Sequence, residues 1–204
     1  MPLIDLSHEI LDGMPVFPGE KSPSLVKDNL PENASYVTYR LESNMHTGTH
    51  LDAPYHAKAD EKPVGSYPLS HFTGPARVID VRGKTRIHMR PEWNELFREY
   101  KFILFCTGHS ALWGKPEYYA SYPVFEDEIA EALRANKVRI AGFDSPSPDA
   151  SPYKFHSIFL QGERFLVENL CNLEELIEIR KFDFCAFPLK IQAEASLIRA
   201  VAKY

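Results

Sequence analysis

Two short apolar runs, Phe102–Cys106 and Val138–Phe143, constrain the fold of this chain more than any other feature. Runs of this length without polar alternation are typical of strands that are buried on both faces. Between them, Glu126–Asn136 places its apolar residues at helical intervals and acidic residues in its first turn. A succession of strand, helix and strand predicts an α/β fold, with a mixed sheet and flanking helices.

Further elements are expected on both sides of this unit. Ala76–Val81 is interpreted as a strand and Arg90–Tyr100 as a helix that begins at a proline. A third helix is expected within Glu163–Ile179, and two strands are expected in the tail 184–202. Sixteen prolines and ten glycines indicate many turns between short elements. Since no repeat or linker interrupts the pattern, we expect one domain over residues 1–204.

The composition argues against several classes of partner. The net charge is -5 without a basic run, so the positive surface needed for nucleic acid is missing. No apolar run is long enough to span a membrane, and the first residues show no signal-peptide pattern. Three widely spaced cysteines, Cys106, Cys171 and Cys185, do not suggest a disulfide framework or a thiolate zinc site. We therefore expect a cytoplasmic protein with a small-molecule partner.

The segment Met45–Ala59, MHTGTHLDAPYHAKA, is rich in metal-ligand side chains. These side chains are His46, His50, Asp52 and His56. On a straight strand, with a rise of ~3.3 Å per residue, His46 and His50 would lie roughly 13 Å apart. Zinc holds its ligands at about 2.0–2.2 Å, so the chain must curl for a shared ion. We expect a tight loop around Gly48 that runs into a short turn ending at Pro54.

This ligand set has a characteristic chemistry. Imidazole and carboxylate suit zinc, manganese or iron, and the lack of thiolates favours a catalytic over a structural site. His56 need not be a ligand, because a histidine beside an activated water can act as general acid or base near neutral pH. The alternative is that these are surface or core histidines with hydrogen-bonding roles. Four ligand-type residues within eleven positions make that alternative the weaker one.

The segment HTGTHLDAPYH resembles the H-x-G-T-H-x-D-x-P-x-H motif of a cyclase family that includes bacterial kynurenine formamidase (arylformamidase) and isatin hydrolase. Four other segments also resemble that family: IDLSHEILDGMPVFPG, AGFDSPSPD, FHSIFLQGERFLVENL and FPLKIQAEASLIRAVA. The resemblance covers essentially the whole chain. It implies a swivelling β/β/α-type fold, hydrolysis of an aryl formamide or cyclic amide by metal-activated water, and a homodimer or homotetramer.

The resemblance also implies the residues of the site. In the family, one metal is held by residues that match His46, His50 and Asp52. A second ion shares the aspartate and is bound by residues that match His156 and Glu168. One or two divalent ions per chain are implied, with zinc preferred and manganese as the alternative. Chemistry alone would not select His156 or Glu168, and Glu168 is equally compatible with a solvated helix.

The acid or base and the residues of the substrate pocket can also be assigned, in part with alternatives. His56 matches the family's proposed general acid or base. Phe17 lies near the place where the formamidases typically carry a pocket tryptophan; phenylalanine lacks the indole N–H, which weakens the case for a kynurenine-type substrate. His109 and Trp113 follow a buried strand, where loops often form sites. Core packing is an equal alternative for Phe17, and an ordinary loop histidine is an equal alternative for His109.

Asp144 and Ser145 follow the next strand and are candidates for orienting metal ligands, or else belong to a turn fixed by prolines. Three functions remain open at this point. They are an arylformamidase-like enzyme, an isatin hydrolase-like lactam hydrolase that uses manganese, and a non-catalytic metal-binding protein. The presence of both Asp52 and His56 makes the last the weakest.

Overall fold

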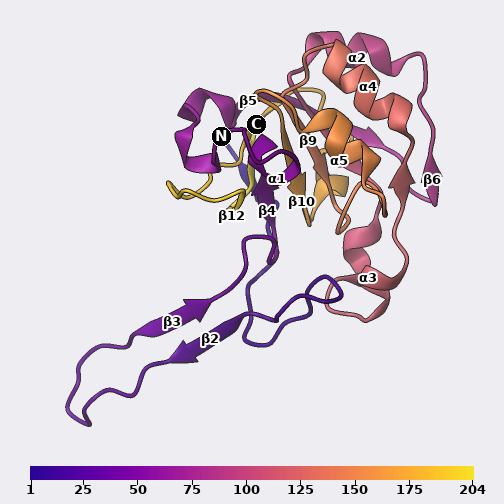
Figure 1. Ribbon diagram of the computed structural model, residues 1–204. Coiled ribbons are helices and arrows are strands. Elements are labelled where there is room, and N and C mark those ends of the chain that lie inside the picture. The colour runs from indigo at the N-terminus through magenta and orange to yellow at the C-terminus, as the bar shows by residue number, and fades with distance from the viewer.

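A nine-stranded sheet forms the centre of the molecule in the computed structural model, which describes residues 1–204 (Figure 1). The strand order is β1-β13-β11-β5-β7-β9-β10-β4-β12. The strands are β1 Leu3–Asp5, β4 His50–Asp52, β5 Thr73–Asp80, β7 Phe102–Cys106, β9 Ile140–Phe143, β10 Phe165–Glu168, β11 Phe182–Cys185, β12 Ala195–Leu197 and β13 Val201–Lys203. The central strands β5, β7, β9 and β10 run parallel, and the strands outside them pair antiparallel.

The remaining elements are short. The helices are α1 Pro54–Ala57, α2 Trp93–Glu99, α3 Glu117–Ala120, α4 Asp127–Ala135 and α5 Lys154–Phe159. Single 3-10 turns are η1 Val64–Ser66, η2 Leu69–His71, η3 His109–Leu112 and η4 Leu173–Leu176. Two small sheets pair β2 Ser24–Lys27 with β3 Tyr39–Glu42 and β6 Arg86–Ile87 with β8 Val124–Phe125. None of the helices has the length and apolar character that crossing a membrane requires.

The two faces of the sheet pack into separate hydrophobic cores. Along β7, Phe102 and Leu104 enter one core, whereas Ile103 and Phe105 enter the other. This alternation follows from the two-residue period of a strand. Helices α2, α4 and α5 lie together on one side of the sheet and cover the second core (Figure 1). The buried parallel strands are thus a layer between two apolar clusters, as the apolar runs predict.

The sheet curls, so strands that are distant in its order come together. Ser7, just after edge strand β1, forms an antiparallel bridge with Leu170, just after β10. The amide of Cys171 also donates to the carbonyl of Leu6 at 3.1 Å. Leu6 and Leu51 accordingly share the first core. The curl brings the N-terminal segment against the ends of β4 and β10.

The predicted α/β fold with a mixed sheet and flanking helices is confirmed. Strand β7 has the predicted bounds, and β5, β9, α2 and α4 overlap the predicted segments. The helix expected within Glu163–Ile179, around LEELIEI, forms only as the short 3-10 turn η4 at the start of that sequence, and β10 occupies the first part of the segment. Residues Asn169 and Asn172, both with left-handed backbone angles, separate the two elements. The pairing of β10 with β9 and β4 outweighs the local helical pattern.

Two smaller expectations are also corrected. The tail 184–202 contributes to three strands, β11, β12 and β13, rather than two. Pro54 begins helix α1 instead of ending a turn. Its fixed φ and missing amide proton suit the first position of a helix, where that proton would have no partner.

Candidate metal centre

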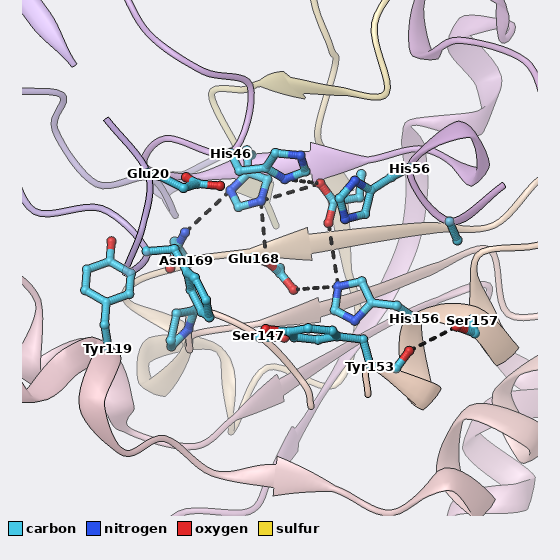
Figure 2. A pocket seen from close by; sticks show the side chains of 15 residues that line it. Glu20, His46, His56, Tyr119, Ser147, Tyr153, His156, Ser157, Glu168 and Asn169 are labelled. Carbon is cyan, nitrogen blue, oxygen red and sulfur yellow. Dashed lines mark hydrogen bonds and ion pairs between the residues drawn. The ribbon is translucent and has the colours of Figure 1, made fainter. Parts of the chain in front are cut away.

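A cavity of about 410 Å³ opens beside β4, β10 and α5 (Figure 2). The residues predicted as metal ligands or as acid and base all line it: His46, His50, Asp52, His56, His156 and Glu168. They come from the continuous segment 46–56, from α5 and from β10. The structure therefore brings together side chains that are more than one hundred residues apart in the sequence.

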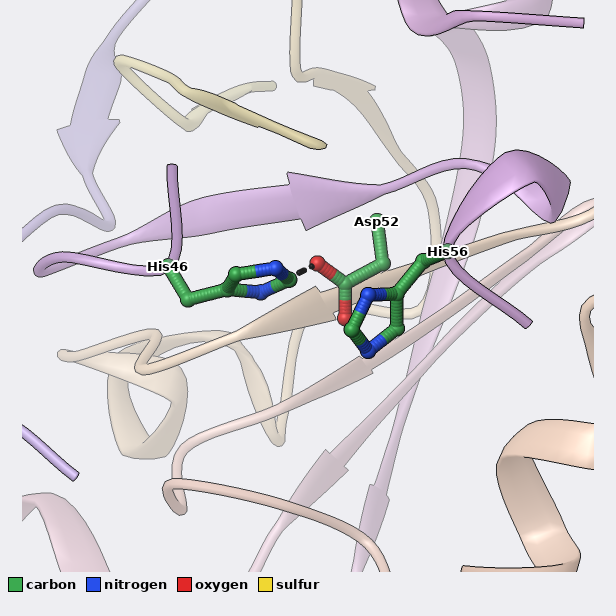
Figure 3. Close-up of side chains that lie close together, drawn as sticks. All are labelled: His46, Asp52 and His56. Carbon is green, nitrogen blue, oxygen red and sulfur yellow. Dashed lines mark ion pairs between the residues drawn. The ribbon is translucent and has the colours of Figure 1, made fainter. Parts of the chain in front are cut away.

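The first half of the cluster is formed by one continuous segment. Gly48 has φ +63°, a left-handed angle that glycine adopts without strain, and the chain reverses there before entering β4. His50 and Asp52 are two residues apart on this strand and share a face. Nδ1 of His46 lies 3.0 Å from Oδ1 of Asp52 (Figure 3). Helix α1 then turns His56 back until its ring centre lies 4.4 Å from that of His46.

The second half comes from β10 and α5. Glu168 pairs directly opposite His50 across the antiparallel strands. Its Oε2 atom lies 3.4 Å from Nε2 of His50. His156, on α5, brings Nε2 to 3.3 Å from Oε1 of Glu168 and 3.9 Å from Oδ2 of Asp52. Asp52 thus faces histidines from both halves of the cluster.

Several polar atoms at the centre of the cluster lack hydrogen bonds. These buried atoms are Nε2 of His50, both carboxylate oxygens of Asp52 and Oε1 of Glu168. Nε2 of His50 lies 3.5 Å from Oδ1 of Asp52, and Oε1 of Glu168 lies 3.3 Å from Nε2 of His156, yet neither contact has hydrogen-bond geometry. Buried polar groups without partners are costly. A divalent cation with nitrogen and oxygen ligands would fit this donor set.

Two groups of three residues could each hold an ion. They are His46, Asp52 and His56, and His50, Asp52 and Glu168, with ligand atoms within 4.8 Å of one another. Asp52 belongs to both groups, as a bridging carboxylate would. The first group includes His56, whose role as ligand or as acid and base therefore needs a direct test.

Hydrogen bonds orient two of the imidazoles. Nδ1 of His50 bonds the carbonyl of Gly48 at 2.9 Å, and Nδ1 of His156 bonds Oδ1 of Asp149 at 2.6 Å. In both rings Nε2 is left facing the carboxylates of the cluster. Partners of this kind fix the tautomer and the direction of a ligand histidine. The carbonyl of Gly48 also accepts a hydrogen bond from Nδ2 of Asn169 at 2.8 Å.

Electrostatics within the cluster separate His56 from the other histidines. Burial opposes charging of His46, but the Asp52 carboxylate outweighs it and raises the pKa of His46 to about 9. Burial is likewise outweighed at His156, where hydrogen bonds to Asp149 and Glu168 raise the pKa to about 10. Burial opposes ionisation of Asp52, but the positive charges of His46 and His50 outweigh it and hold the pKa of Asp52 well below its usual range. Partial burial lowers the pKa of His56, although Asp52 acts in the opposite direction.

The three residues expected in the pocket wall lie in different places. Phe17 lines the cavity and packs edge to face against Tyr119, with ring centres 6.2 Å apart. His109 lies outside the cavity lining, because its Nε2 atom is engaged by the carbonyl of Tyr118 at 2.8 Å. Trp113 also lies outside the lining and stacks on His8 at 3.9 Å.

Asp144 does not orient a ligand in the structure. Its carboxylate accepts hydrogen bonds from the amides of Thr107 and Gly108 and from the hydroxyl of Thr107. The hydroxyl of Ser145 donates to the carbonyl of Ser147. The orienting carboxylate is Asp149, at the end of the same proline-rich segment.

Sequence reasoning missed Asp149, Asn169, Glu20 and Tyr153 among the residues that line or support the cavity. Asp149 could have been found from its place four residues after a loop serine and seven before His156. Asn169 directly follows Glu168 and was open to the same inference. Glu20 and Tyr153 have no comparable local pattern, since only the folded chain brings them to the cavity.

Comparison with known proteins finds a family and relatives for this chain. Residues 4–150 match the family model described as "Putative cyclase". Kynurenine formamidase of Bacillus mycoides (strain KBAB4) is 30% identical over 207 residues, covering 98% of this chain and 96% of that protein. Kynurenine formamidase of Salinibacter ruber (strain DSM 13855 / M31) is 30% identical over 213 residues, covering 100% and 98%.

Solved structures share the fold. An isatin hydrolase bound to the product analogue thioisatinate superposes with a TM-score of 0.85 at 18% identity, covering 99% of this chain and 92% of that chain. A predicted metal-dependent hydrolase from Bacillus stearothermophilus gives a TM-score of 0.75 at 21% identity, covering 98% and 97%. Because the family model matches residues 4–150, which is more than half of the chain, and a relative 30% identical aligns over 98% of it, the chain belongs to the "Putative cyclase" family.

Proposed function

We propose that this protein is a metal-dependent hydrolase that cleaves the C–N bond of an aryl formamide or a cyclic amide, in the manner of kynurenine formamidase. The observation that supports this most is a group of buried side-chain atoms that could bind a metal and have no hydrogen-bond partner. They belong to Asp52, His50 and Glu168. They line a cavity large enough for a small organic molecule. The names of the relatives that align over the whole chain support the reaction class.

The ligands in this proposal are the five residues that the family resemblance implies, all of which line the cavity. His46, His50 and Asp52 would hold one ion, and Asp52, His156 and Glu168 a second. Zinc is the first choice and manganese the alternative, since both accept imidazole and carboxylate. When bound, a divalent cation supplies Lewis-acid activation of water and of an amide carbonyl.

His56 is proposed as the general acid and base. Its side chain lines the cavity within the same cluster, and its lowered pKa favours the neutral imidazole near pH 7. A neutral ring can accept the proton of the attacking water and then deliver it to the leaving nitrogen.

A lactam hydrolase of the isatin type is the second candidate. Phe17 lines the cavity without the indole N–H that a tryptophan would offer. That difference favours a substrate that needs an aromatic face there rather than a hydrogen-bond donor. In either case the protein is proposed to act as a homodimer or homotetramer, which the apolar exposed surface of β3 and its neighbours supports.

The test is metal loading followed by hydrolysis assays. The purified protein, supplied with zinc or with manganese, is assayed on N-formylkynurenine, simple aryl formamides and isatin. We expect one or two bound ions per chain, hydrolysis that a chelator abolishes, and recovery when metal is restored. A His50→Ala, Asp52→Ala variant should lose both metal and turnover. Failure of the wild type to bind either metal would contradict the proposal.

A further inference from the structure

We propose that Glu20 forms a subsite for a protonated amine on the substrate, in the wall of the metal cavity. The inference rests on the proposed function, because it names which aryl or cyclic amides the cavity prefers. Glu20 lines the cavity at the end where His46 and Asn169 lie (Figure 2). A carboxylate there would meet a substituent of the substrate while the cluster engages the amide.

The charge of Glu20 has no partner within the protein. Lys21, its neighbour in the sequence, pairs with Glu42 instead. No lysine or arginine is among the residues that line the cavity. A substrate carboxylate would therefore find no lysine or arginine in this wall, whereas a substrate ammonium would find the carboxylate of Glu20 without a salt-bridge partner.

The carboxylate is held in a fixed position relative to the cluster. Nδ2 of Asn44 donates to Oε2 of Glu20 at 2.6 Å. Oδ1 of the same asparagine accepts the backbone N–H of His46 at 2.9 Å. Asn44 thus ties Glu20 to the loop that presents His46, while Oε1 of Glu20 accepts no hydrogen bond from the protein. The bridge through Asn44 therefore links the exposed carboxylate of Glu20 to the loop of His46 and leaves Oε1 available to a substrate group.

Aromatic rings complete the subsite. Phe17 and Tyr119 line the same cavity and pack edge to face. The hydroxyl of Tyr119 donates to the carbonyl of Pro15 at 3.3 Å, which holds the ring against the segment that carries Glu20. Burial, followed by the negative charge of Glu20, raises the pKa of Tyr119, so the two side chains are electrostatic neighbours. Carboxylates and aromatic faces together are the usual partners of ammonium groups.

The ligand class that fits is an aryl or cyclic amide with a primary amine on a short side arm. The aryl ring would lie against Phe17 and Tyr119, and the ammonium would donate to Glu20. Matched compounds that carry a hydroxyl or a carboxylate in place of the amine would lose the ion pair, and the carboxylate would also meet repulsion.

The experiment compares binding of two product-like probes to the zinc-loaded protein. The probes are meta-aminomethylaniline and meta-hydroxymethylaniline, measured by calorimetry at neutral pH. We expect the amine to bind about three- to fivefold more tightly than the alcohol, with the ratio falling as salt is added. In Glu20→Gln, which keeps the acceptor for Asn44, the ratio should fall to near one. Glu32→Gln, which makes the same charge change on the β2–β3 hairpin, should keep the ratio.

Three results would overturn the subsite: equal binding of the two probes to the wild type, no binding of either, or a ratio that persists in Glu20→Gln. The last would mean that the amine meets the metal rather than Glu20. Hydrolysis of formamides is measured separately, so the two ideas fail independently. Suppose that the wild type prefers the amine, that Glu20→Gln does not, and that neither protein hydrolyses an amide. That outcome would support the subsite and refute the proposed function.

Discussion

His56 differs from the other histidines of the cavity, because partial burial lowers its pKa whereas the pKa values of His46 and His156 are raised. We expect His56→Ala to reduce kcat by about 10²- to 10³-fold with the metal content unchanged, since proton transfer is lost and the ligands remain. Steady-state kinetics and elemental analysis of the same preparations measure both quantities.

An exposed histidine supplies the control. His88→Ala removes an imidazole beside Glu126, outside the cavity lining, and should leave both kcat and metal content as they are. If His56→Ala loses metal in proportion to turnover, His56 is a ligand, as its group with His46 and Asp52 allows.

Tyr118 is linked to the cluster through Asn169 rather than by direct contact. Its hydroxyl donates to Oδ1 of Asn169 at 2.8 Å, which turns Nδ2 of that amide toward the carbonyl of Gly48. The same carbonyl holds Nδ1 of His50. We expect Tyr118→Phe to weaken zinc affinity about tenfold, because the orientation of His50 is less strongly fixed.

Competition with a chromogenic chelator measures that affinity directly. Tyr67→Phe is the matched control, since its hydroxyl bonds the carbonyl of Gly162 away from the cluster. Equal affinity in Tyr118→Phe and the wild type would show that Asn169 holds its position without the tyrosine hydroxyl.

His8 gives the fold a dependence on pH that is independent of the cluster's own charges. Its ring stacks on Trp113 at 3.9 Å with 5° between the planes. Burial lowers the pKa of His8 to about 4, although a hydrogen bond from the ring to the backbone of Leu170 acts in the opposite direction. Since the unfolded chain binds the proton more readily, stability is complete above pH 6.5 and is lost as the pH falls toward 4.

The variant His8→Phe keeps a stacked ring without a titrating group. Between pH 7 and pH 5, the wild type should lose on the order of 2 kcal/mol more unfolding free energy than the variant. Urea unfolding of both proteins at the two pH values measures the difference. Parallel losses would mean that His8 does not titrate differently in the folded state.

At the scale of an element, β9 is packed too closely to accept an added methyl group at Gly142. A Cβ there would lie 2.5 Å from Cδ2 of Leu104 on β7 and 2.9 Å from Cδ1 of Leu170. We expect Gly142→Ala to destabilise the protein by about 1–3 kcal/mol, measured by thermal or urea unfolding. Combining it with Leu104→Ala removes the contact, so the two losses should be less than additive. Strict additivity would contradict the clash.

Elements were predictable from the sequence where their cause is local. The apolar run of β7 and the helical spacing of α4 are properties of a few neighbouring residues, and both elements form as expected. Strand β10 was missed because it forms through pairing with β9 and β4, which a single segment does not reveal. The short tail strands depend in the same way on partners far along the chain.

The residues of the cavity, too, were predictable from the sequence only where their arrangement has a local cause. The segment from His46 to His56 is local, and its curl follows from the reach of a metal ion. His156 and Glu168 entered through the family resemblance alone. Glu20 became visible only in three dimensions, because the bridge through Asn44 joins it to His46 across segments that no spacing rule connects.

At the scale of the whole molecule, the hairpin of β2 and β3 projects from the body as an arm (Figure 1). Its large apolar side chains are exposed: Val26, Tyr36, Val37, Tyr39 and Leu41. A two-stranded hairpin is at best marginally stable in water, and apolar surface of this kind is typical of an interaction site. The expected homodimer would give the arm a surface to pack against.

We therefore expect the arm to be required for self-association. Light scattering of the wild type should give the mass of a dimer or tetramer, and Val37→Lys with Tyr39→Lys should shift it toward the monomer, because charges on both residues oppose burial of the arm. Leu69→Lys places the same charge on another exposed apolar residue, on η2, and should keep the oligomer. A monomeric wild type at micromolar concentration would contradict the expectation. A double variant that keeps the mass of the wild-type oligomer would show that the interface lies elsewhere, since a charged arm could not be buried between subunits.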